Sequence, residues 1–105
     1  MAQFSVHGNT NPDTKTAIPY LLNVQSDLLD DLATRIVVPL LPANAMKGKT
    51  LKTLTPIFEI DGRQYVMLTP QLAGVPNKIL GATVADLTSK RDEIIAALDL
   101  LITGI

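Results

Sequence analysis

The sequence predicts a mainly β protein that ends in one α-helix. The Asp61-Gly62 pair lies between two runs rich in β-branched and apolar residues, which is typical of a β-hairpin with a type I′ turn. After Thr83 the apolar residues change to the spacing of one helical face, at Leu87, Ile94, Ile95, Leu98, Leu101 and Ile102. The 105 residues are enough for one domain, which we expect to span positions 1–105.

Runs with strand patterns occupy 3–7, 20–25, 35–40, 56–60, 63–69 and, as one short addition, 75–80. Polar and apolar residues alternate in the first run, which indicates a half-buried strand. The β-branched run at 35–40 is continuous, which indicates a strand buried on both faces. Pro39 then marks an end, an edge or a bulge of that strand. The outline is about five strands before the helix.

The C-terminal helix has recognisable residues at both ends. Ser89, followed three residues later by Asp92, predicts a start similar to a capping box. Asp92 and Glu93 suit the positive end of the helix dipole. Gly104 lies where helices commonly end.

The composition excludes several classes of site. The chain has no cysteine, so it has no disulfides, thiolate zinc sites or cysteine nucleophiles. His7 is the one histidine, which excludes metal sites built from several imidazoles. Nine basic and ten acidic residues give a formal net charge of −1, without the basic excess of a general nucleic-acid binder. We therefore expect no metal and no cofactor.

The N-terminus and the apolar runs predict the location of the protein. Residues 1–8 lack a basic stretch followed by an apolar run, so we expect no secretory signal. The longest apolar run, 36–43, contains two prolines and is far short of the ~20 residues that span a bilayer. These features predict a cytoplasmic protein. Charged residues make up only 18% of the chain, which predicts that a partner covers part of its surface.

The candidate catalytic groups are few. His7 could act as a general base, but without a positioned partner a surface or rim histidine is the favoured interpretation. The Asp30-Asp31 and Asp92-Glu93 pairs are adjacent in sequence, so their side chains point in different directions. A small basic cluster, favoured as a solvated loop because it lacks the glycines of a phosphate loop, comprises Lys47, Lys49 and Lys52.

Several segments together resemble a known family. They are Met1-Ala2-Gln3-Phe4, the stretch from Val24-Gln25-Ser26-Asp27 to Asp30, Arg35 to Leu40, Val84-Ala85-Asp86-Leu87 and the final Gly104-Ile105. In order and over essentially the whole chain, they resemble CcdB, the toxin of ccd toxin–antitoxin modules. The resemblance implies an antiparallel SH3-like barrel or sheet with a smaller second sheet and a C-terminal helix, shared with MazF and Kid toxins, in a homodimer.

The resemblance also implies an activity. A CcdB-like toxin binds the A subunit of DNA gyrase and traps the gyrase–DNA cleavage complex, which inhibits replication. It has no catalytic centre and no cofactor, and a CcdA-like antitoxin neutralises it. It reaches DNA only indirectly, through gyrase or through the toxin–antitoxin complex that autoregulates transcription. Such modules act in plasmid maintenance and also occur in chromosomes.

The family's contact positions can be carried over onto this sequence. The implied gyrase-binding residues are Leu28, Leu29, Asp99, Ile102, Thr103, Gly104 and Ile105. The implied antitoxin-binding residues are Gln3, Phe4 and His7. Plasmid-borne members typically have tryptophan where this chain has Thr103, and often asparagine at Asp99 and phenylalanine at Ile102. A large aromatic residue is a typical hot spot, so these departures imply a different balance of contacts with gyrase.

Two alternatives remain open. One is an endoribonuclease like MazF and Kid, which needs an acid–base pair and basic residues along a cleft. The net charge of −1 argues against it, although Arg35, Arg63 and Lys78 could cluster. The other is a degenerate toxin that only binds its antitoxin.

Overall fold

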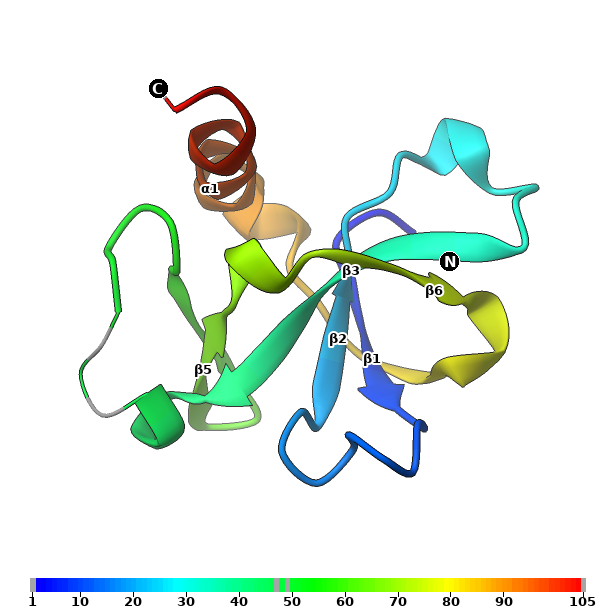
Figure 1. Cartoon of the computed structure of the whole chain (residues 1–105), viewed down its shortest axis with the longest axis horizontal. Coiled ribbons are helices and arrows are strands. Elements are labelled where there is room, and N and C mark those ends of the chain that lie inside the picture. The colour runs from blue at the N-terminus through cyan, green and yellow to red at the C-terminus, as the bar shows by residue number, and fades with distance from the viewer. Residues whose placement is uncertain (1, 47, 49, 105) are drawn as a thin grey trace.

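The computed structural model describes residues 2–46, 48 and 50–104. Antiparallel strands form a curled sheet, and one α-helix, α1 (Arg91–Thr103), follows the last strand (Figure 1). The strands are β1 (Ser5–Asn9), β2 (Tyr20–Asn23), β3 (Thr34–Pro42), β4 (Ile57–Ile60), β5 (Arg63–Met67), β6 (Ala73–Pro76) and β7 (Leu80–Asp86). Short 3₁₀ turns connect them: η1 (Asp27–Leu29), η2 (Ala43–Met46), η3 (Thr69–Gln71), η4 (Asn77–Ile79) and η5 (Thr88–Lys90). The predicted class, mainly β with a C-terminal helix, is confirmed.

The long strand β3 organises the sheet, whose order is β4-β5-β3-β2-β1-β7. One edge of β3 pairs with β2. The other edge pairs first with β6, along 34–37, and then with β5, along 40–42. The small second sheet of the expected fold is therefore present as an extension of the main one, formed by β4 and β5.

Pro39 lies inside β3, at the point where the partner strand changes from β6 to β5. Its carbonyl accepts a hydrogen bond from the Leu68 amide at 2.9 Å, so the missing N–H lies on this same edge. The gap between β6 and β5 allows proline in a central strand without loss of a ladder hydrogen bond. Pro39 was predicted at an end, an edge or a bulge of the strand, and it lies at none of these.

The hairpin prediction is confirmed. Asp61 and Gly62 connect β4 and β5 with φ values of 52° and 78°, as a type I′ turn requires. Gly104 ends α1 as predicted: its φ is 74°, and its amide donates to the Leu100 carbonyl at 3.1 Å.

The predicted start of the helix is wrong. β7 continues to Asp86, and α1 begins after Lys90 without a side-chain cap, so Ser89 and Asp92 form no capping box. The chain instead turns at Asp86, whose Oδ1 accepts hydrogen bonds from the Thr88 amide and hydroxyl. These two hydrogen bonds hold the pKa of Asp86 below its ordinary value.

The main core lies between the curled sheet and α1. Ile94 and Ala97 of α1 are fully buried against the apolar face of the sheet, and Ile95 and Leu98 pack at the edge of this core. Ile102 was predicted on the packed face, but its side chain is 73% exposed because the last turn of α1 extends past the core. A smaller cluster on the opposite face contains Leu21, Val37 and Leu80. Within the part of the chain that the structure describes, no helix is long and apolar enough to cross a membrane.

Candidate functional site

The segment 27–34, which contains η1, presents leucine side chains to solvent. Each of its eight residues is exposed, and Leu28 is exposed to 94%. η1 begins after Ser26, whose hydroxyl oxygen accepts a hydrogen bond from the Leu28 amide at 3.2 Å. Leu29 and Leu32 are each about half exposed. Both family positions on this segment, Leu28 and Leu29, therefore lie at the surface.

The end of α1 forms a second exposed group. Asp99, Ile102, Thr103 and Gly104 are all exposed there. The Thr103 hydroxyl donates to the Asp99 carbonyl at 2.7 Å, so it is bonded to its own helix. Ile102 is the most exposed large apolar side chain among the described residues of this helix end. The seventh family position, Ile105, lies outside the described residues.

Within one chain these two groups are separate. α1 packs mainly against η3, η5 and the sheet. η1 instead comes before the start of β3, which is the end that pairs with β6. Figure 1 shows the cyan η1 segment and the red end of α1 well apart, on either side of the molecule. The structure brings Leu28 beside Leu29 and groups the helix-end residues, but it does not join the two groups.

Two of the three family positions for antitoxin binding are near the N-terminus and differ in exposure. Gln3 is half-buried, and its backbone amide donates to the Asp27 carboxylate at 2.7 Å. Its side-chain amide donates to the Val24 carbonyl at 3.2 Å. Phe4 has a φ of 71° and places its side chain in the main core. Gln3 therefore lies against the start of η1, while Phe4 is buried.

The third position, His7, was predicted at the surface or rim, and this is wrong. The side chain is 2% exposed, with Nε2 2.7 Å from Ser5 Oγ and Nδ1 3.0 Å from the Gly81 carbonyl oxygen. A carbonyl oxygen only accepts, so its partner Nδ1 carries a proton. Ser5 lies two residues before His7, on the same face of β1, so the alternation of the strand could have predicted this contact. The histidine thus links β1 to β7.

One comparison with known proteins decides the family. The family model described as CcdB protein matches residues 3–104, nearly the whole chain. The chain belongs to the CcdB family. Membership makes it a toxin of a toxin–antitoxin module, in a family whose members are not catalytic enzymes.

The basic residues of the ribonuclease alternative do not converge in this CcdB chain. Arg35 is buried under the 27–34 segment. Lys78 follows β6, which meets the start of β3, whereas Arg63 lies on β5, which meets the end of β3. The two ends of β3 are eight residues apart, which corresponds to about 26 Å of strand. Arg35 is buried, and Lys78 and Arg63 therefore belong to segments that meet opposite ends of β3.

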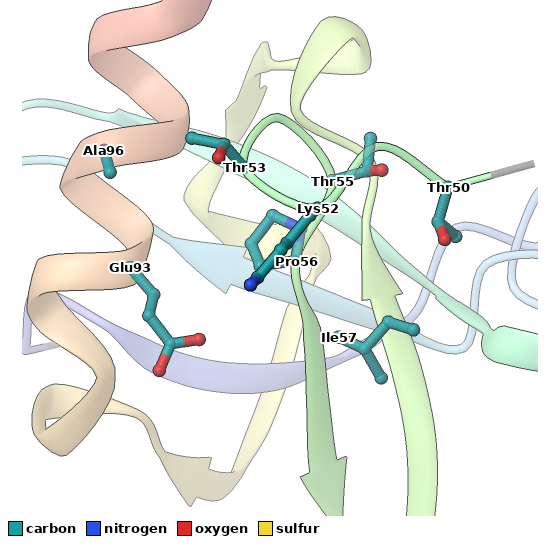
Figure 2. Close-up of a pocket in the computed structure, with 8 residues that line it drawn as sticks. All are labelled: Thr50, Lys52, Thr53, Thr55, Pro56, Ile57, Glu93 and Ala96. Atoms are coloured by element: carbon teal, nitrogen blue, oxygen red, sulfur yellow. The ribbon is translucent and has the colours of Figure 1, made fainter.

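Figure 2 shows a concave site beside α1, a cavity of about 390 Å³ between residues 50–57 and the helix. Lys52 and Glu93 are its charged lining residues, and the others are threonine, proline, isoleucine and alanine. Lys47 and Lys49, the other members of the predicted basic cluster, lie outside the described residues. Among the residues that are described, no group of three His, Asp or Glu could hold a metal ion.

The adjacent carboxylates do not form acid–base pairs. The Asp30 carboxylate forms an ion pair with Arg35, with Oδ1 3.1 Å from Nη2, and the neighbouring Asp31 is exposed. Asp92 and Glu93 lie in the first turn of α1, where their charges suit the helix dipole. The sequence did not indicate that the backbone of the 27–34 segment is held by side chains of Gln25, Arg35 and Asn77. An arginine at the start of a β-branched run is the one feature that could have indicated them.

Proposed function

We propose that this CcdB-family toxin binds the A subunit of DNA gyrase and traps the cleaved gyrase–DNA complex, which inhibits replication. The exposure of Leu28, at 94%, carries this proposal together with that of Ile102, at 73%. Large apolar side chains without partners in their own chain are typical anchors of protein interfaces. Both lie at positions that the family uses against gyrase.

The proposed gyrase surface comprises Leu28, Leu29, Asp99, Ile102, Thr103, Gly104 and Ile105. Because Thr103 replaces the usual tryptophan, we assign the anchoring role at the helix end to Ile102. The chain acts by occupying gyrase and needs no cofactor. It meets DNA through gyrase, or through a complex with its antitoxin that autoregulates transcription.

A gyrase cleavage assay tests the proposal. Purified gyrase and supercoiled DNA are incubated with the toxin, and the complex is opened with detergent and protease. We expect linear DNA to accumulate with the toxin and not without it, and induction of the toxin to arrest growth in sensitive cells. Cleavage of RNA at defined sites without linear DNA would instead support the ribonuclease alternative. Harmless accumulation in those cells would support a degenerate toxin.

We expect the toxin to be a homodimer, in which the gyrase surface is completed between protomers. The separation of the Leu28 group from the helix-end group within one chain supports this arrangement, as does the low fraction of charged residues. Light scattering across a dilution series should give the mass of a dimer. A stable monomer at micromolar concentration would contradict the prediction.

Mixed dimers test how the surface is built. In a dimer of Leu28→Asp and Ile102→Asp protomers, a surface shared between protomers leaves one of its two copies fully intact. A surface within each protomer leaves a defect in both copies. We therefore expect the mixed dimer to bind gyrase while both parent dimers fail.

The antitoxin is expected to bind an overlapping surface through a disordered, acidic segment. The hydrogen bond between Gln3 and Asp27 supports the overlap, because it places an antitoxin position against the segment that carries Leu28. Phe4 and His7 are buried, so we expect them to shape this surface from within. Antitoxin peptide should release gyrase already bound to the toxin. Peptide that binds without releasing gyrase would show that the two sites are separate.

A further inference from the structure

We infer that Arg35 is a positioning residue, which fixes the backbone of the 27–34 segment so that Leu28 is held out for its target. The inference rests on the proposed function for its consequence, though not for its geometry. No residue of the segment is buried, and Leu29 and Leu32 are only about half covered, so apolar packing contributes little to its conformation. Ordering free backbone costs about 1–2 kcal/mol per residue, so other contacts must supply this stability.

The guanidinium of Arg35 supplies several of them. Nη2 donates to the Asp30 carbonyl at 2.9 Å and to the Asp30 carboxylate at 3.1 Å. Nη1 lies within 3.3–3.4 Å of three further carbonyl oxygens, those of Leu29, Leu32 and Thr34. Arg35 is only 4% exposed, so its guanidinium is shielded from water, while the Asp30 side chain that it contacts is half exposed.

Two side-chain amides, the buried Gln25 and the half-buried Asn77, add further contacts. We call these two residues and Arg35 the carbonyl clamp. The Gln25 side chain donates to the Leu29 carbonyl at 3.0 Å and accepts from the Ile36 amide at 3.1 Å. The Asn77 side chain donates to the Leu32 carbonyl at 3.0 Å. The clamp thereby ties the segment to β3 on one side and to η4 on the other.

The energetics favour a positioning role over a purely stabilising one. Burial of a guanidinium is expensive, and an apolar residue of similar size is often at least as good for stability alone. Arg35 Nε and Asn77 Oδ1 are buried without a hydrogen-bond partner among the described residues, which adds to this cost. What the arginine provides is several donors in a fixed planar geometry, aimed at the carbonyls of one segment. A segment held in this way loses less backbone conformational entropy when it binds.

The test compares variants of the full-length toxin by amide hydrogen exchange and by affinity for the A subunit of gyrase. In Arg35→Met, we expect exchange of the amides at 28–33 to accelerate by about tenfold or more, with α1 and β2 unchanged. Affinity should fall by about tenfold or more, because the segment must then be ordered on binding. Arg35→Lys keeps the charge but not the planar geometry, and should recover part of both losses.

Two further variants keep the test decisive. Asn77→Ala removes one contact from a half-buried position, so it tests the clamp if Arg35→Met fails to fold. Arg63→Met, at an exposed arginine outside the clamp, should change neither exchange nor affinity. Unchanged exchange at 28–33 in folded clamp variants, or acceleration spread evenly over the chain, would overturn the inference. If the wild-type toxin fails to bind gyrase, the proposed function fails, while the exchange measurements still decide the clamp.

Discussion

Leu28→Asp is expected to lower the affinity for the A subunit of gyrase by about 100-fold or more and to abolish growth arrest. Leu28 is almost fully exposed, so in the free protein the substitution removes almost no buried area. The free energy of unfolding should therefore change by less than about 0.5 kcal/mol. In the complex, the aspartate would bring an unpaired charge into the apolar centre of the interface. Calorimetric titration with purified gyrase measures the first effect, and thermal melting measures the second.

Ile57→Asp is the matched control for this prediction. Ile57 is a partly exposed apolar residue on β4, outside the proposed gyrase surface, and receives the same charge. It should retain gyrase binding and growth arrest. Equal loss of binding in both variants would show that added charge, and not the position of Leu28, decides affinity.

Ile94→Ala and Ile102→Ala make the same chemical change on one helix. We expect the first to lower the stability of the fold and the second to weaken gyrase binding. Ile94 has no exposed surface, so its truncation leaves a cavity between α1 and the sheet and should cost about 3 kcal/mol of stability. At a fixed protein concentration this lowers the melting temperature by about 15 °C. Ile102→Ala should leave the melting temperature nearly unchanged but weaken gyrase binding, because this side chain extends past the core.

Thermal melting and gyrase affinity measured on both variants separate fold from function. A large loss of stability in Ile102→Ala would mean that a second copy of the chain covers this side chain in the dimer. Undiminished gyrase binding by Ile102→Ala would remove it from the proposed surface. A stable Ile94→Ala variant would contradict the packing of α1 on the sheet.

The local features of this fold could be predicted from the sequence. Asp61-Gly62 determines its turn by itself, since few other residue pairs accept positive φ at both positions. Gly104 ends the helix for the same reason. Leu28 and the helix end, whose positions are carried over from the family, are exposed.

The features that escaped prediction depend on residues far apart in the chain. His7 looked like a surface residue because one of its partners, the Gly81 carbonyl, lies on β7 and becomes a neighbour only when the sheet forms. Pro39 is tolerated inside β3 because two different strands meet there, which no local pattern of residues reveals. The clamp likewise joins Arg35 to Asn77, from another part of the sequence, through a shared carbonyl oxygen.

The donors of Arg35, Gln25 and Asn77 reach mainly backbone oxygens, and every amino acid carries a backbone oxygen. The shape of the 27–34 segment is therefore largely independent of which side chains it displays. Mutations at 28, 29, 31 and 32 can accumulate without refolding the segment. Arg35 cannot change as freely, because it contacts the backbone of several residues of the segment at once. When toxin and antitoxin sequences coevolve, such a segment allows the side chains of the recognition surface to change while its backbone conformation is kept. A library randomised at these four positions should keep slow amide exchange at 28–33, whereas in a library randomised at 25, 35 and 77 the folded members should exchange faster there.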